Sequence, residues 1–147
     1  MPKRIHKIQG ISLGTASSNT RYGRKEDSLL VTLPQESILS GKFTSNKLKA
    51  APVKLAIENL SNSKKAKKVL LINAGNANAA TGPKGLKDVR KYCKEIALDF
   101  KIRQENVIPF STGVIGEPLA IENYLSAFRE ASKSLVRING KKLLRLF

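Results

Sequence analysis

The sequence predicts an α/β fold of the α+β type, in which mixed sheets are flanked by helices. The order of the predicted elements supports this prediction, and length and composition indicate the size and the core of the domain. Apolar runs of strand length and apolar patterns of helical spacing follow one another along the chain. The 147 residues are enough for one ordinary domain with a hydrophobic core. Tryptophan is absent and aromatic residues make up only 5% of the chain, so we expect aliphatic side chains to fill that core.

The first part of the chain carries three predicted strands. Alternating apolar residues predict a strand over residues 7–13, and the polar residues 15–27 predict a long loop or an irregular hairpin. A second apolar run predicts a strand over residues 28–33. The sequence Pro34-Gln35-Glu36 predicts a turn, from which residues 37–43 return as an antiparallel strand.

Helices and strands are predicted to alternate in the rest of the chain. Pro52 stands at the start of a predicted helix that ends near Leu60, where the missing amide hydrogen costs nothing. The later elements are a strand over residues 69–72, a helix over 83–100 that Thr81 caps, a strand over 107–110 and a helix over 121–133. We therefore expect a single domain over residues 1–133 and a divergent basic tail over 134–147.

The chain is strongly basic, with a formal net charge of +16 and an isoelectric point near 10.2. Such a charge suits nucleic-acid binding. However, the basic residues are spread along the chain, and the sequence shows no zinc-ligand spacing, aromatic platform or basic recognition helix. The charge therefore favours a lysine-rich surface, and a non-catalytic basic binding module is retained as the alternative function.

The single cysteine, Cys93, falls within a helical pattern and is interpreted as a small core residue. A catalytic cysteine would need a nearby histidine, and the only histidine is His6. One cysteine also fits a reducing compartment. The sequence shows no secretory signal and no apolar stretch of membrane-spanning length, so we expect a cytoplasmic protein without membrane contact.

Residues 69–82 form the most distinctive stretch, in which a buried strand runs into a turn of Asn, Gly and Ala. Residues this small let two backbones, or a backbone and a ligand, approach closely. A phosphate-binding loop would need adjacent Gly and Lys followed by Ser or Thr, but here Pro83 precedes Lys84. We therefore expect the asparagine side chains to brace a tight turn rather than to contact reacting atoms.

A second candidate feature, Ser111-Thr112-Gly113, follows the strand over residues 107–110. It could be a plain turn. Alternatively, a strand that ends in a glycine turn can leave a backbone amide unpaired and facing a cleft, and the Thr112 hydroxyl could supply a second donor. Two fixed donors can each accelerate a reaction through an oxyanion by on the order of a hundredfold or more. Thr112 and Gly113 are thus the candidate residues for oxyanion stabilisation.

Five segments together carry a family resemblance, and their order and spacing match the same family. They are residues 43–46, 50–53, 72–79, 81–85 and 109–116. Over about residues 8–133 the chain resembles the ornithine acetyltransferase family. These enzymes are the bifunctional glutamate N-acetyltransferases and amino-acid acetyltransferases of arginine biosynthesis.

The resemblance implies a fold like the α-chain part of the ornithine acetyltransferase and self-cleaving aminopeptidase-like sandwich. Family members cut themselves at an Ala-Thr bond, and the new N-terminal Thr of the β chain moves acetyl from N-acetylornithine to glutamate. Thr112 and Gly113 would form the oxyanion hole. The implied partner is the β portion of the same precursor, in an α2β2 heterotetramer. No metal or cofactor is implied, with acetyl-CoA as an alternative acetyl donor.

The nucleophilic threonine of the family has no counterpart in this sequence. Where family members carry a Thr-Thr-Asp segment, this chain reads Ser134 to Gly140 without a threonine. We therefore expect an N-terminal α-chain fragment, which a shifted or interrupted reading frame would explain. Such a chain is expected to be inactive by itself, because an oxyanion hole without a nucleophile starts no reaction.

Overall fold

The computed structural model describes residues 8–61 and 64–137 of the chain, and they build one mixed sheet. Its strands are β1 (Ser12–Ala16), β2 (Ser28–Leu33), β3 (Lys68–Asn73), β4 (Val107–Ser111) and the short β5 (Val136–Arg137), in the spatial order β4-β3-β2-β1-β5. Strands β3 and β4 are parallel, and all other neighbours are antiparallel. Together with the helices, this sheet confirms the predicted α/β fold class.

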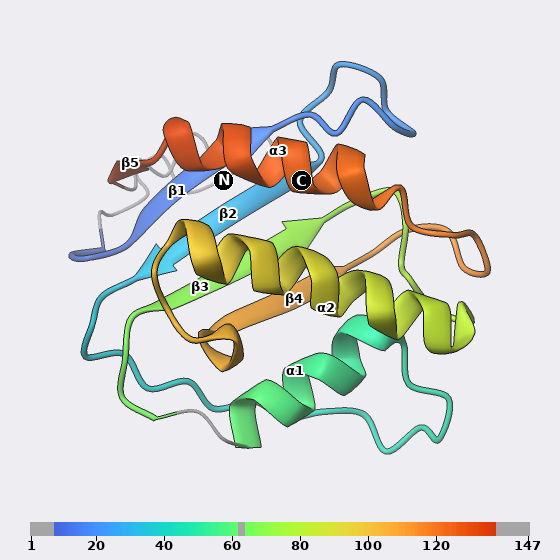
Figure 1. Cartoon of the computed structure of the whole chain (residues 1–147), viewed down its shortest axis with the longest axis horizontal. Helices are drawn as coiled ribbons and strands as arrows, with labels where there is room; N and C mark the ends of the chain where they lie inside the picture. Colours follow the sequence, from blue (N-terminus) through green and yellow to red (C-terminus); the bar gives the residue numbers. More distant parts are fainter. Residues whose placement is uncertain (1–7, 62–63, 138–147) are drawn as a thin grey trace, which may run out of the picture.

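Three helices cover one face of the sheet, as Figure 1 shows. They are α1 (Ala51–Ser61), α2 (Gly82–Asp99) and α3 (Ile121–Lys133), with a short 3₁₀ helix, η1 (Gln104–Asn106), before β4. Helix α3 packs on β1 and β2, whereas α1 and α2 pack on β4. The main core lies in this interface, where Leu30, Leu71 and Val107 of the sheet meet apolar side chains of the helices.

The opposite face of the sheet carries a second, smaller apolar cluster. Its buried members are Leu13, Leu29 and Val31, with Ile11, Leu33, Leu70 and Ile72 partly buried around them. Because side chains alternate along a strand, these residues point away from the main core. The cluster includes no residue of α1, α2 or α3. We call this surface the helix-free face.

Two predicted strands differ from the structure. The first strand is Ser12–Ala16 instead of residues 7–13, because Gly10 adopts a φ of 78° in a turn ahead of it. The predicted strand over residues 37–43 is wrong, since these residues form no regular structure. Both edges of β2 are already occupied, by β1 on one side and β3 on the other, so no returning strand can pair with it.

The other predicted elements are confirmed, with one correction to a helix cap. Strand β2 and helix α3 have the predicted bounds, and the remaining elements agree within about two residues. Thr81 precedes α2, but its hydroxyl donates to Asn78 Oδ1 at 2.7 Å and makes no cap to the helix. Strand β5 takes in two residues beyond the predicted boundary at 133. The rest of the predicted tail, residues 138–147, lies outside the described residues.

Cys93 is a core residue, as predicted. It is fully buried on α2 within the main core. Burial raises the pKa of its thiol well above the ordinary value, because the thiolate would lose its hydration. The thiol therefore stays protonated, which suits a structural side chain and not a nucleophile.

Tyr92→Phe is expected to stabilise the protein. Tyr92 is fully buried beside Phe128, with ring centroids 5.7 Å apart. Its hydroxyl makes no hydrogen bond of ordinary geometry in the described part of the chain, although the Ser111 side chain lies close enough to oppose the rise that burial causes in its pKa. A buried unpaired hydroxyl costs about 1–3 kcal/mol, so its removal should raise the free energy of unfolding by about 1 kcal/mol. Urea denaturation measures this change. Tyr22→Phe, at a half-exposed tyrosine, is the matched control and should change stability by less than about 0.5 kcal/mol. A loss of stability in Tyr92→Phe would contradict the prediction.

Candidate functional site

Three loops meet at the end of the sheet where β1, β3 and β4 terminate. Strands β1, β3 and β4 run in the same direction, because β1 and β3 are both antiparallel to β2 and β4 is parallel to β3. Their carboxyl ends lead into the loops 17–27, 74–81 and 112–120. The Ala74 amide donates to the Asp27 carbonyl at 2.8 Å, and the Thr112 amide donates to the Asn73 carbonyl at 3.0 Å. The fold thus brings the two sequence motifs into direct contact.

The backbones of Gly75 and Gly113 touch where the two motifs cross. Both glycines have positive φ, of 98° and 131° respectively. A Cβ atom on Gly113 would lie 2.3 Å from the Gly75 carbonyl carbon and 2.5 Å from the Asn76 nitrogen. Beyond this crossing the loops pair briefly, with the Val114 amide donating to the Gly75 carbonyl at 3.2 Å. The close backbone approach expected from the small residues of the turn is therefore confirmed.

The three asparagines of the turn are buried and brace it, as expected. The Nδ2 group of Asn73 donates to the Asn76 carbonyl at 2.8 Å, and that of Asn76 donates to the carbonyls of Glu117 and Pro118 at 3.2 and 3.1 Å. Asn78 Nδ2 donates to the Gly85 carbonyl at 3.0 Å. All three side-chain amides are thus engaged with backbone carbonyls, which ties the turn to the loop 112–120 and to α2.

The structure distinguishes the donors at Thr112 and Gly113. The Thr112 amide is engaged with Asn73, so it is not available to a ligand. The Gly113 amide has no hydrogen-bond partner among residues 8–61 and 64–137, and the same holds for the Thr112 hydroxyl. Both residues are exposed. Two donors on consecutive residues are therefore left without a partner in the described part of the chain.

The alternation of side chains along β4 indicates on which side of the sheet the Thr112 side chain lies. Val107 points into the main core beneath the helices, and Ser111 has the same parity, with its hydroxyl donating to Asn73 Oδ1 at 2.6 Å. Thr112 continues the ladder by one residue, since its amide is bonded to Asn73. Its side chain is therefore expected on the opposite side, the helix-free face, together with Phe110, which is 45% exposed.

A cavity of about 280 Å³ is lined on one side by Gly75 and Asn76. Its lining includes Thr20, Arg21, Glu117 and Tyr124, none of which the sequence interpretation selected as site residues. The Tyr124 hydroxyl donates to the Ala74 carbonyl at 2.9 Å, and Arg21 pairs with Glu117 at 3.1 Å. No local pattern signals this contact between loops 17–27 and 112–120, because the two residues are 96 positions apart.

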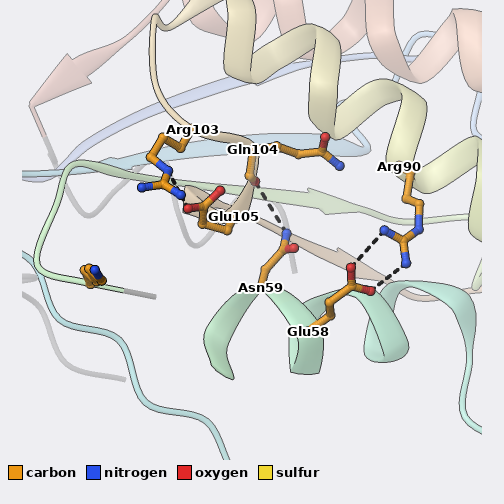
Figure 2. Close-up of a pocket in the computed structure, with 7 residues that line it drawn as sticks. Glu58, Asn59, Arg90, Arg103, Gln104 and Glu105 are labelled. Atoms are coloured by element: carbon orange, nitrogen blue, oxygen red, sulfur yellow. Dashed lines mark hydrogen bonds and ion pairs between the residues drawn. The ribbon is translucent and has the colours of Figure 1, made fainter. Parts of the chain in front are cut away.

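A second cavity, of about 430 Å³, lies at the opposite end of the sheet, where β4 begins (Figure 2). Four of its charged side chains are joined in two pairs, with Arg90 donating to Glu58 at 2.9 and 2.5 Å and Arg103 lying 2.5 Å from Glu105. At its base the buried Asn59 donates to the Val107 carbonyl at 2.8 Å. These interactions connect α1 to α2 and to the start of β4, and the lining of the cavity contains neither sequence motif.

Over residues 8–61 and 64–137, no three His, Cys, Asp or Glu side chains lie close enough together to hold a metal ion. None of the helices in this part of the chain is both long and apolar enough to cross a membrane.

The chain matches the sequence profile of the ArgJ family over residues 12–144. Two relatives are described as arginine biosynthesis bifunctional protein ArgJ. The one from Methylococcus capsulatus is 41% identical over 90% of this chain and 32% of its own length. The one from Colwellia psychrerythraea is 36% identical over 95% of this chain and 35% of its own length. The chain thus spans about a third of the length of these relatives.

Two solved structures share the fold. The crystal structure of the ArgJ protein from Bacillus halodurans superposes with a TM-score of 0.72 at 30% identity, covering 83% of this chain and 63% of that one. The ornithine acetyltransferase from Mycobacterium tuberculosis, solved with ornithine, superposes with a TM-score of 0.83 at 23% identity, covering 94% and 75%. The profile match covers most of the chain, and we conclude that the chain belongs to the ArgJ family.

Proposed function

We propose that this chain is the N-terminal part of an acetyltransferase that moves acetyl from N2-acetylornithine, or from acetyl-CoA, to glutamate. In this proposal the Thr112 hydroxyl and the Gly113 amide form the oxyanion hole. The threonine nucleophile comes from a β portion outside these 147 residues, released by autocatalytic cleavage at an Ala-Thr bond. The observation that carries the proposal is the pair of unpaired donors on consecutive exposed residues of an ArgJ-family fold.

The arrangement suits acyl transfer in two steps. The free α-amino group of an N-terminal threonine, with a pKa near ~8, accepts the proton of its own hydroxyl as the oxygen attacks the acetyl carbonyl. The carbonyl oxygen becomes an oxyanion, and the Thr112 O–H and Gly113 N–H donate to it. Collapse breaks the C–N bond, the proton passes to the leaving ornithine amine, and acetyl stays on the threonine. The glutamate amine then attacks this ester through a second oxyanion in the same hole. Collapse breaks the ester C–O bond, and the proton lost by the glutamate amine passes through the α-amino group to the leaving threonine oxygen, which restores the free hydroxyl.

Gly113 contributes a donor whose position is set before substrate binds. Its amide is part of a backbone held against Gly75, so it needs no reorganisation when negative charge develops. The Thr112 hydroxyl can rotate, but the backbone of Thr112 is held by the hydrogen bond from its amide to the Asn73 carbonyl. A fixed donor beside a rotating one suits a hole that serves two successive tetrahedral intermediates.

The helix-free face is the proposed contact surface for the β portion. Its apolar cluster lies on the side of the sheet without helices, and Phe110, two residues before Thr112 in the alternation, adds exposed apolar area there. Apolar sheet faces normally pack against a second layer of structure. A β portion docked there would bring its threonine to the side on which the Thr112 hydroxyl is expected. The assembled enzyme would be an α2β2 heterotetramer.

Reconstitution tests this function. The chain is co-expressed with the portion of the Methylococcus capsulatus relative that follows the matched residues, and acetyl transfer from N-acetylornithine to glutamate is measured by mass spectrometry. We expect activity from the complex and none from either part alone. Replacing the threonine of the Ala-Thr junction with alanine is the control and should abolish transfer. A complex that assembles and cleaves but does not transfer acetyl would overturn the proposal, as would activity of the chain alone.

A further inference from the structure

We propose that Asn73 and Ser111 are positioning residues that set the orientation of the Thr112 and Gly113 donors. This inference rests on the proposed oxyanion hole and extends it to residues that touch no substrate. The free donors make no hydrogen bonds of their own within the described ranges, so their orientation must come from neighbouring groups. The question is which neighbours supply it.

Asn73 is bonded to residues on both sides of the contact between the two motifs. It is the last residue of β3, paired in register with Ser111, the last residue of β4, and it is only 1% exposed. Its carbonyl oxygen accepts from the Thr112 amide at 3.0 Å, and its Oδ1 accepts from the Ser111 hydroxyl at 2.6 Å. One residue thus holds the backbone of Thr112 directly and the residue before it through a side chain.

The same side chain also holds the turn of its own motif, residues 69–82. Its Nδ2 group donates to the Asn76 carbonyl at 2.8 Å, which closes the turn that contains Gly75. The Gly75–Asn76 peptide in turn lies against Gly113, as the contact distances of 2.3–2.6 Å for an added Cβ show. Asn73 therefore restrains Thr112 from the strand side and Gly113 from the loop side.

A positioning residue differs from a merely structural one in its hydrogen-bond partners, because only the former bonds to the residues that carry the donors. Asn78 is equally buried, but the hydrogen bonds of its side chain run to the Gly85 carbonyl and the Thr81 hydroxyl at the start of α2. Loss of an Asn78 bond should cost stability without moving Thr112. Asn73 and Asn78 thus provide a matched pair, in which the same substitution has a structural effect at both positions and a functional effect at only one.

Three variants of the 147-residue chain test this directly. Asn73→Asp keeps the acceptor for Ser111 but places an oxygen against the Asn76 carbonyl, Ser111→Ala removes the hydroxyl, and Asn78→Asp is the control. Amide hydrogen exchange followed by NMR should show protection of the Thr112 amide reduced about tenfold in the first two variants and unchanged in the third. Equal loss of protection in all three, or in none, would overturn the inference.

The reconstituted enzyme gives the functional readout. Because a misplaced donor weakens binding of the transition state and not of the substrate, Asn73→Asp and Ser111→Ala should lower kcat about tenfold or more with KM within about twofold. Ser111→Thr retains the hydroxyl and should restore kcat, and Asn78→Asp should leave it unchanged.

The two readouts separate this inference from the proposed function. If the unsubstituted complex is inactive, the proposed function fails, and hydrogen exchange still decides whether Asn73 holds Thr112. If the complex is active and Asn73→Asp retains full kcat, the positioning role is wrong and the function stands. If Asn73→Asp does not fold, Ser111→Ala, which loses a single partly buried hydroxyl, decides the outcome.

Discussion

Replacing Gly113 with alanine is expected to lower the free energy of unfolding by about 3 kcal/mol or more. An alanine Cβ would lie 2.3 Å from the Gly75 carbonyl carbon and 2.6 Å from its oxygen, and neither backbone atom can rotate away. Overpacking of this kind costs about 1–3 kcal/mol, and the positive φ of 131° adds strain of about 1–3 kcal/mol. Urea denaturation followed by circular dichroism measures the loss.

Gly116→Ala is the matched control for Gly113→Ala. Gly116 lies in the same loop and has a φ of 84°, but an added Cβ would meet no atom within 4 Å. Its replacement therefore carries only the backbone strain, of about 1–2 kcal/mol. The difference between the two variants measures the contact between the motifs. Equal destabilisation would contradict a close packing of Gly113 on Gly75.

The contact between the motifs was only partly predictable from sequence. Strand β2 and helix α3 were assigned correctly because their apolar patterns are regular and bounded by turn residues. The meeting of the two motifs follows from the parallel pairing of β3 and β4, since carboxyl ends of parallel strands share an edge. That pairing depends on contacts between residues far apart in sequence, which no local pattern encodes.

Hydrogen bonding within the site was less predictable still. The sequence identified a strand exit with an unpaired amide, but both Thr112 and Gly113 fit that description. Only the geometry shows that the Asn73 carbonyl engages the Thr112 amide and leaves that of Gly113 free. The same holds for the failed strand over residues 37–43, because the neighbours of β2 come from β1 and the distant β3.

Replacing Thr112 with valine is expected to have the largest effect on catalysis. Valine matches threonine in shape but lacks the hydroxyl, so one of two oxyanion donors is lost. In the reconstituted enzyme kcat should fall by about 10²–10³-fold, with little change in KM, because the donor acts on the transition state. Stability should change by less than about 0.5 kcal/mol, since Thr112 is exposed and its hydroxyl makes no bond to the described residues.

Thr112→Ser is the control, because it keeps the hydroxyl and loses a methyl group. Its kcat should stay within about tenfold of the unsubstituted enzyme, well above that of Thr112→Val. Equal activity of the valine and serine variants would mean that the hydroxyl is not a donor and that Gly113 stabilises the oxyanion without it. Thr112→Val leaves in place both the hydrogen bond from the Thr112 amide to Asn73 and the contact between Gly75 and Gly113. A loss of kcat in this variant therefore reports on the hydroxyl alone.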